Sequence, residues 1–391
     1  MSARRLRRRS ESTGGTTRLR SALRRHPWAR LGTALLLFIL VVTVFAGFFS
    51  PYGPREQNSD FSYAPPSRLH FRHQDGFGLR PFVYRVDGIV DPETYVRTYV
   101  EDVSTRYYVR LFARGTPYRL LGLFPTNVHL FGVRATDGSE DARLYLFGAD
   151  AFGRCLFSRC LAGGRVSLAV GPFVILLLLP IAVAVGGFSG YFGGAVDVIL
   201  QRISEAFMIF PGLPVVLVVG AALSALEASS LVSFFGVMAT LAVLGWARVA
   251  RVLRGQVIAL RERDFVVAAR ASGASDLRVL FRHILPHTSS YLIVTATLLV
   301  PGMMLTEASL SFLGFGLREP MVSWGGLLNA AMDVSVIDRY PWTLIPAAFI
   351  IASVIALNLI GEGLRDAVDA LSRASASAPA RGSQRRSHGA R

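Results

Sequence analysis

The sequence predicts an all-α polytopic membrane protein with six membrane-spanning helices and a β-rich insertion outside the cytoplasm between the first two. Two observations predict this fold class. The 391 residues are 52% hydrophobic, with a mean hydropathy of +0.42, which is more apolar than an ordinary soluble domain of this length. The arginines behind the net charge of +16 gather at 4–30, 248–282 and 373–391, beside long uncharged stretches, as cytoplasmic segments of membrane proteins do.

The chain begins with a basic segment followed by an apolar one. Residues 1–30 contain ten arginines and predict a cytoplasmic tail that attracts anionic membrane lipid. A mitochondrial presequence is the alternative interpretation of this composition. Residues 31–49 are uncharged and long enough to cross a bilayer, so we expect a first transmembrane helix there. A second basic cytoplasmic tail is predicted at 371–391.

Residues 50–150 form the one sizeable aqueous segment and are expected to be an extracytoplasmic insertion. Short alternating stretches such as 106–112, with Asp87-Gly88 and Asp137-Gly138 as turns, predict a small β-rich domain. Its arginines do not oppose this placement, because long translocated segments do not obey the charge rule.

Residues 151–370 are expected to form the main transmembrane domain. Uncharged stretches predict its five spans at 166–196, 207–226, 228–247, 288–306 and 341–361. The second span should end in a glycine-rich turn at 190–194, and the third and fourth should form a tight hairpin near Glu227. Six crossings place both termini on the same side, and both termini are arginine-rich, which predicts that both are cytoplasmic.

The segment 248–286 lies between two predicted spans and carries eight arginines, so we expect it to be a cytoplasmic loop. One short helix should begin at Asp264 and end before Gly273, a residue suited to a left-handed C-terminal position. Ser275 or Asp276 can begin a second helix with an apolar stripe. The stripe consists of Leu277, Leu280, Phe281 and Ile284. Such a helix-turn-helix fits docking into a groove of a soluble partner.

Several other functions are disfavoured by what the sequence contains. The chain has no lysine, and a nucleotide-binding phosphate loop requires one, so any ATP that drives this protein must bind to another subunit. The arginine clusters follow apolar spans rather than a binding face, so no nucleic-acid partner is expected. No cofactor, metal or catalytic residue is expected either. His283 and His287 are separated by Pro286 and have no third ligand nearby, and hydrolase and zinc-protease motifs are absent.

Cys155 and Cys160 are the only cysteines, and their spacing matches no zinc pattern. Two unpaired residues are favoured over a disulfide, because positions five apart on a helix point away from each other. Whether the two are oxidised stays open at this point.

The loop sequence resembles the cytoplasmic motif of importer-type ABC transporter permeases, in which Glu-Ala-Ala is followed by Gly and later by Leu-Pro. Ala268-Ala269, Gly273 and Leu285-Pro286 match the motif with its spacing, whereas Val267 replaces its Glu and His283 its Ile. The resemblance implies that this loop couples the chain to ATPase subunits. The residues expected to form the coupling surface are Asp264, Ala268, Ala269, Arg270, Gly273, Ala274, Leu285 and Pro286.

Further motifs place the resemblance in the dipeptide and oligopeptide branch of this family. They lie at 147–159, 307–314, 324–325 and 358–366, so the likeness covers most of 147–369. Ala149 and Cys155 depart from the usual Thr and Asp of the first motif, whose alternative interpretation is an amphipathic helix on the outer membrane surface. Glu307 follows an apolar stretch and must reach water, a partner or a cavity. A structural role at the outer gate, such as capping a broken helix, is favoured over contact with the cargo.

The resemblance implies a permease subunit of a bacterial inner-membrane importer, with peptides as cargo and nickel, glutathione or sugars as alternatives. The implied partners are a second permease in a heterodimer, two ATP-binding subunits, an extracytoplasmic solute-binding protein and membrane lipid. The competing function is an ATP-independent secondary transporter or channel, which would need charges inside the spans or inverted repeats. Neither is evident in the sequence.

Overall fold

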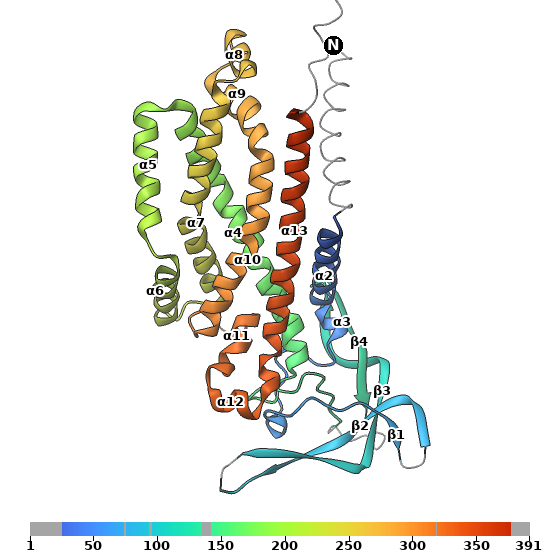
Figure 1. The fold of residues 1–391 in the computed structure, drawn as a ribbon. Coiled ribbons are helices and arrows are strands. Elements are labelled where there is room, and N and C mark those ends of the chain that lie inside the picture. Colours follow the sequence, from blue (N-terminus) through green and yellow to red (C-terminus); the bar gives the residue numbers. More distant parts are fainter. Residues whose placement is uncertain (1–25, 74–75, 94–95, 135–141, 318, 377–391) are drawn as a thin grey trace, which may run out of the picture.

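The computed structural model describes residues 26–73, 76–93, 96–134, 142–317 and 319–376 (Figure 1). Within these ranges, five helices or helical segments are long and apolar enough to cross a membrane. They are α2 (Pro27–Val44), α4 (Leu156–Phe192), α7 (Ser230–Arg261), the segment Asp276–Phe312 that ends in α10 (Ser289–Phe312), and Pro341–Ala370, which contains most of α13 (Ile345–Ala376). The structure is thus mostly helical, with a bundle that fits a polytopic membrane protein. Residues 1–25 and 377–391, the greater part of both predicted tails, lie outside the described residues.

A sixth candidate span is formed by two helices rather than one. The sequence predicted a continuous helix at 207–226, whereas α5 (Gly194–Ile209) and α6 (Gly212–Ala225) meet at an angle of 74°. The break falls at Phe210–Pro211, where the backbone is extended. The residue before a proline is driven out of the helical region, and Pro211 cannot donate a backbone hydrogen bond, so the helix ends here.

Two other predicted boundaries were wrong in a similar way. The first span was placed at 31–49, but α2 begins at Pro27 and a separate short helix, α3 (Ala46–Phe49), follows it. The second was placed at 166–196, but α4 begins ten residues earlier, at Leu156. Arg165 therefore lies inside α4, and its guanidinium donates to the carbonyl oxygens of Thr43 and Val44 at 3.0 and 2.8 Å. These carbonyls at the end of α2 accept hydrogen bonds from a charged group that the sequence had placed outside the span.

Small residues let the long helices pack closely. A Cβ atom at Gly186 of α4 would lie 2.5 Å from the carbonyl oxygen of Ala250 in α7, and one at Gly190 would lie 2.7 Å from that of Arg254. Similarly, Gly32 of α2 lies against Ala356 of α13. Close backbone approach through glycine is the usual packing mode of membrane helices, where burial of apolar surface gives little drive.

The segment between α3 and α4 contains an antiparallel sheet in the order β1-β2-β3-β4. Its strands are β1 (His70–His73), β2 (Gly76–Val90), β3 (Arg97–Leu120) and β4 (Phe124–Arg134). A tight turn joins β3 to β4, with Leu121 and Gly122 both at positive φ (+53° and +75°), as the right-handed twist of a hairpin requires. His129 of β4 is buried, and its Nδ1 lies 2.9 Å from the carbonyl oxygen of Gly47, which attaches the sheet to α3.

The sheet and the connection between α7 and α10 lie at opposite ends of the bundle (Figure 1). The connection contains α8 (Asp264–Ala271), α9 (Asp276–Val279), a π-helical turn η2 (Leu280–Ile284) and a 3-10 turn η3 (Leu285–Thr288). Near the sheet, a short 3-10 turn η1 (Ser59–Phe61) precedes β1, and α10 leads into α11 (Trp324–Leu328), η4 (Asn329–Met332), α12 (Val334–Arg339) and η5 (Pro341–Leu344). The predicted hairpin near Glu227 lies between α6 and α7, and Glu227 has a φ of +50°.

Candidate functional site

The turn between α8 and α9 has the geometry expected from Gly273. This residue has a φ of +77°, and no atom lies within 4 Å of the place where its Cβ would be. The Ala274 N–H donates to the carbonyl oxygen of Ala269 at 3.1 Å, and that of Gly273 donates to Arg270 at 2.9 Å. These bonds satisfy carbonyls at the end of α8 with a left-handed glycine, so the turn has a defined shape.

Tyr191, near the end of α4, holds both halves of this helix-turn-helix. Its hydroxyl donates to the carboxylate of Asp276, the first residue of α9, at 2.6 Å. The guanidinium of Arg270, in the last turn of α8, lies 5.1 Å from the centre of the Tyr191 ring, within the range of a cation–π interaction. One aromatic side chain on a long helix thus fixes the position of two short ones.

Apolar contacts attach the inner face of the helix-turn-helix to the bundle. Val266 of α8 and Val279 of α9 are fully buried with Leu253 and Val257 of α7. Ala269, Ala274 and Leu285 pack against the same cluster. Pro286 lies in the first turn of η3, and the His287 ring lies 4.7 Å from that of Phe265. This histidine packs on an aromatic ring, and no metal-binding group of three His, Cys, Asp or Glu residues occurs in the described part of the chain.

The predicted apolar stripe is divided between two environments. Leu280 and Ile284 are buried in the bundle, whereas Leu277 and Phe281 are each 53% exposed. Only part of the stripe is therefore available to a partner, because Leu280 and Ile284 of η2 hold this segment on the bundle. The exposed half continues onto α8. We define the outer apolar face as Phe265, Val267, Leu277 and Phe281, with exposed fractions from 37 to 55%. Here "outer" means only that these side chains point away from the bundle.

An ion pair braces the same end of the bundle. Asp197 of α5 accepts from Nε of Arg254 in α7 at 2.6 Å, and the Ser189 hydroxyl of α4 also donates to Asp197. Together with Ser189, the pair connects α4, α5 and α7. Sequence reasoning missed it, although an acid directly after a long uncharged stretch and an arginine in the next basic cluster were the available signals.

Glu307 does not form the helix cap that was the example given for its structural role. It lies within α10, which continues to Phe312, so it does not cap a helix end. It is 1% exposed and reaches no open water. The Ser311 hydroxyl donates to its Oε1 at 2.6 Å, and its Oε2 has no hydrogen-bond partner among the described residues.

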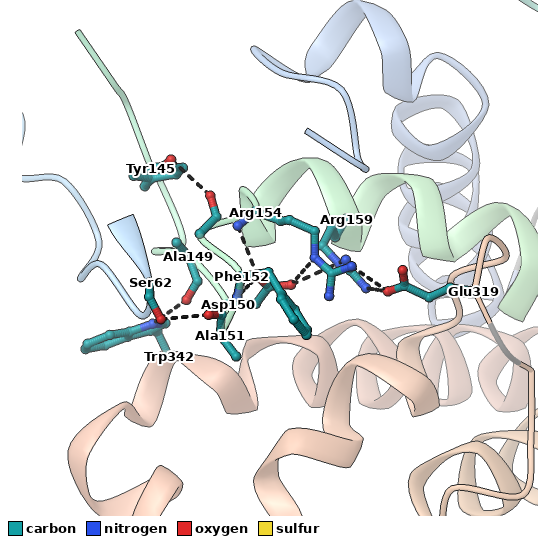
Figure 2. A network of polar contacts seen from close by, with 11 residues as sticks. Ser62, Tyr145, Ala149, Asp150, Ala151, Phe152, Arg154, Arg159, Glu319 and Trp342 are labelled. Carbon is teal, nitrogen blue, oxygen red and sulfur yellow. Dashed lines mark hydrogen bonds and ion pairs between the residues drawn. The ribbon is translucent and has the colours of Figure 1, made fainter. Parts of the chain in front are cut away.

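The motif at 147–159 forms a compact turn followed by the start of α4, rather than the surface helix of the alternative interpretation (Figure 2). The Asp150 carboxylate accepts the backbone N–H groups of Phe152 and Arg154 at 2.9 and 3.0 Å. The Trp342 indole donates to the carbonyl oxygen of Ala149 at 3.2 Å, which joins the turn to η5. Cys155 directly precedes α4, and both cysteines are buried free thiols. Burial raises the pKa of the Cys155 thiol, so it stays protonated and unreactive.

Two buried arginines of this turn share two carboxylates, in what we call the outer ion cluster (Figure 2). Arg154 lies 2.7 Å from Asp150 and 2.6 Å from Glu319. Arg159 lies 3.3 Å from Asp150 and 2.9 Å from Glu319. Partial burial acts to raise the pKa of Glu319, but hydrogen bonds from Arg159 and the charges of both arginines outweigh it and hold the pKa below its ordinary value. Glu319 was not predicted, since nothing local marks a partner 160 residues away.

Two family models of known proteins match parts of this chain. The family model described as "Binding-protein-dependent transport system inner membrane component" matches residues 182–373. A second model, "N-terminal TM domain of oligopeptide transport permease C", matches residues 17–66. The stretch between them, 67–181, includes the sheet and the outer turn and lies outside both matches.

The matches to curated relatives extend over most of each relative's length. A putative peptide permease protein of Brucella ovis is 38% identical over 224 residues, which are 57% of this chain and 72% of the relative. An oligopeptide transport system permease protein of Bacillus subtilis is 37% identical, with 57 and 70% coverage. A glutathione transport system permease protein of Pectobacterium atrosepticum is 36% identical, with 60 and 75% coverage. The chain therefore belongs to the family of binding-protein-dependent transport system inner membrane components, and it is a membrane-embedded permease subunit of an ABC importer whose ATPase activity lies in partner subunits.

Proposed function

We propose that this permease imports peptides across a bacterial inner membrane. The support is that relatives covering similar parts of the chain are named for peptide, oligopeptide and glutathione transport. The proposed complex contains this chain, a second permease, two ATP-binding subunits and an extracytoplasmic solute-binding protein, in contact with membrane lipid. Nickel or sugars would be the alternative cargo.

In the proposed topology, α5 and α6 together make one of six crossings. An even number of crossings places both termini on one side, and the arginines around α7 and α8 favour the cytoplasm for that side. Residues 1–30 and 371–391 are then the cytoplasmic tails, and α2, which begins at Pro27, makes the first crossing. The sheet within 50–150 lies outside, where it either receives the solute-binding protein or covers the entrance. Residues 151–370 form the transmembrane domain.

The outer apolar face carries the proposal that 264–286 is the coupling loop, since residues 248–261 of the predicted loop belong to α7. Its four side chains are exposed at the end of the bundle opposite the sheet, while the same two helices are held to α4 and α7 by Tyr191 and by buried valines. An exposed apolar surface on a rigidly held element is suited to a groove in another subunit. Closure of the ATPases would then move α8 and α9 as one body with α7 and expose the path alternately to each side.

The coupling residues proposed from the sequence have distinct parts in this arrangement. Asp264 begins α8, and Gly273 sets the angle between the two helices. Arg270 locks α8 onto Tyr191. Ala268 is exposed on α8, and the other members, which pack against the bundle or lie in η3, are Ala269, Ala274, Leu285 and Pro286. For Glu307 we propose a structural role inside α10, through its bond to Ser311.

The test places a charge on the outer apolar face. Leu277→Asp should abolish co-purification of the ATPase subunits and ATP-dependent uptake, because a carboxylate in an apolar groove is strongly unfavourable. The control is Val334→Asp in α12, which is 76% exposed at the other end of the bundle and should leave the subunits bound. Thermal unfolding of both variants checks folding. ATPases that stay bound to Leu277→Asp, with normal uptake, would exclude this surface as the docking site.

A further inference from the structure

A cavity of about 250 Å³ lies where the sixth candidate span is broken. It is bounded by the end of α5, the start of α6, α7 and α10. Its lining includes Phe207, Leu213, Leu241, Arg248, Met303 and Thr306. Most of the lining side chains are apolar, but polar groups also face the cavity, and Arg248 is the one charged residue of its lining.

The position of the cavity favours water or cargo over lipid as its content. The break between α5 and α6 lies near mid-height between the α8–α9 end and the sheet end (Figure 1). Its lining residues on α7 and α10 fall within the central turns of those helices. Non-helical backbone at membrane depth does not face hydrocarbon, because its polar groups would stay unsatisfied there; it lines a polar cavity or is covered by protein.

Arg248 is the charged member of this lining, and its surroundings differ from those of its neighbours. Arg251 and Arg254, on the following turns of α7, lie next to the carboxylates of Glu205 and Asp197. The Arg248 side chain is exposed, and no hydrogen bond or ion pair with another described residue engages it. A guanidinium this close to apolar surroundings is costly unless it meets water or an anion.

We propose that Arg248 binds a carboxylate of the cargo as it passes the break, and so makes this permease selective for anionic groups. This inference rests on the proposed function, since every linear peptide with a free C-terminus carries such a carboxylate. The planar guanidinium can donate two parallel hydrogen bonds to it. The apolar side chains of the lining offer contacts to cargo side chains of varied shape without selecting among them.

The experiment measures uptake by the complete complex, purified through a tag on this chain and reconstituted in liposomes with its solute-binding protein. The probe is a mixture of two casein peptide digests, one untreated and one with its carboxyl groups amidated, quantified inside the liposomes by mass spectrometry. Because the same binding protein serves every variant, its own preference cancels from the comparison. Arg248→Gln should lower the ratio of untreated to amidated peptide by about tenfold, the size expected for a charged hydrogen bond.

Two variants make the result specific. Arg248→Lys keeps a positive charge and should keep most of the preference. Arg251→Gln removes the next arginine of α7, which does not line the cavity, and should leave the ratio unchanged. An unchanged ratio in Arg248→Gln would overturn the proposal. Loss of the second permease from that variant would also overturn it, because Arg248 would then pair with an acidic residue of the second permease. A change in ratio that depends on the anionic lipid content of the liposomes would overturn it as well. Absence of ATP-dependent peptide uptake by the unsubstituted complex would instead overturn the proposed function itself.

Discussion

At the scale of single residues, the outer ion cluster predicts a pH-dependent contribution of Glu319 to stability. Arg154 and Arg159 are each 6% exposed, so Glu319→Gln leaves two buried guanidinium groups with one carboxylate. Because Glu319 itself is about half exposed, we expect a loss of no more than about 1 kcal/mol at neutral pH. Thermal unfolding of the purified protein in detergent measures it.

The direction of the pH dependence follows from the lowered pKa of Glu319. A carboxyl whose pKa is lower in the folded state stabilises that state above its unfolded value, which is ordinarily 4.5. The contribution is lost as the pH falls through the folded pKa. The difference in unfolding temperature between the native chain and Glu319→Gln should therefore be constant near neutral pH and vanish below the folded pKa. Glu262→Gln, at a 76% exposed side chain 3.9 Å from Arg261, is the control and should show no comparable difference. A difference that persists in strong acid would contradict this account.

The same residues show what a sequence can and cannot reveal about a site. Gly273 was predicted in its left-handed position because the signal is local, with helix formers before it and a helix start after it. Asp150 and Arg154 were noticed as part of a motif, but their shared partner Glu319 was not. Ion pairs between distant segments depend on how helices pack, and no spacing along the chain records that. The same reason hid the pairing of Asp197 with Arg254.

At the scale of elements, the turn between α8 and α9 predicts that a side chain at Gly273 uncouples the transporter. Gly273→Val has space for its side chain, since no atom lies within 4 Å, but a left-handed backbone costs a β-branched residue about 1–2 kcal/mol or more. We expect the angle between the helices to change. ATP hydrolysis by the complex should then continue while uptake falls, and membrane insertion should stay intact.

Gly255 of α7 supplies the matched control for this prediction. No atom lies within 4 Å of the place where its Cβ would be, as at Gly273, but Gly255 belongs to a regular helix, where valine is accepted at little cost. Gly255→Val should keep uptake coupled to hydrolysis. Uptake and hydrolysis are measured on the same reconstituted sample. Normal uptake by Gly273→Val would show that the angle of this turn does not transmit the motion.

Elements were predicted well where apolar length decided them and poorly where packing did. The stretches 228–247 and 341–361 lie largely inside α7 and α13, but both helices extend beyond the predicted C-terminal ends. α4 begins earlier than expected because Arg159 and Arg165 find acceptors in the outer ion cluster and at the end of α2. A charged residue ends a span that is predicted from sequence. In the folded chain, a hydrogen-bonding partner from another segment allows the helix to continue through that residue.

At the scale of the whole molecule, the two ends of the bundle carry different surfaces. The α8–α9 end presents the outer apolar face among arginines, and the opposite end carries the sheet and the outer ion cluster (Figure 1). Between them, the broken span and its cavity lie near mid-height. An importer requires a path between two ends that bind different partners, since cargo arrives at one end and the ATPases act at the other.

This polarity predicts which end meets a membrane-impermeant thiol reagent. The native cysteines are both buried, so labelling should report introduced cysteines alone. In spheroplasts, Leu123→Cys at the β3–β4 hairpin and Val334→Cys in α12, with native exposures of 74 and 76%, should be labelled without permeabilisation. Arg278→Cys in α9, also at an exposed position, should be labelled only after the membrane is opened. The opposite pattern would invert the topology and remove the coupling role of 264–286, because the ATPases could not reach it.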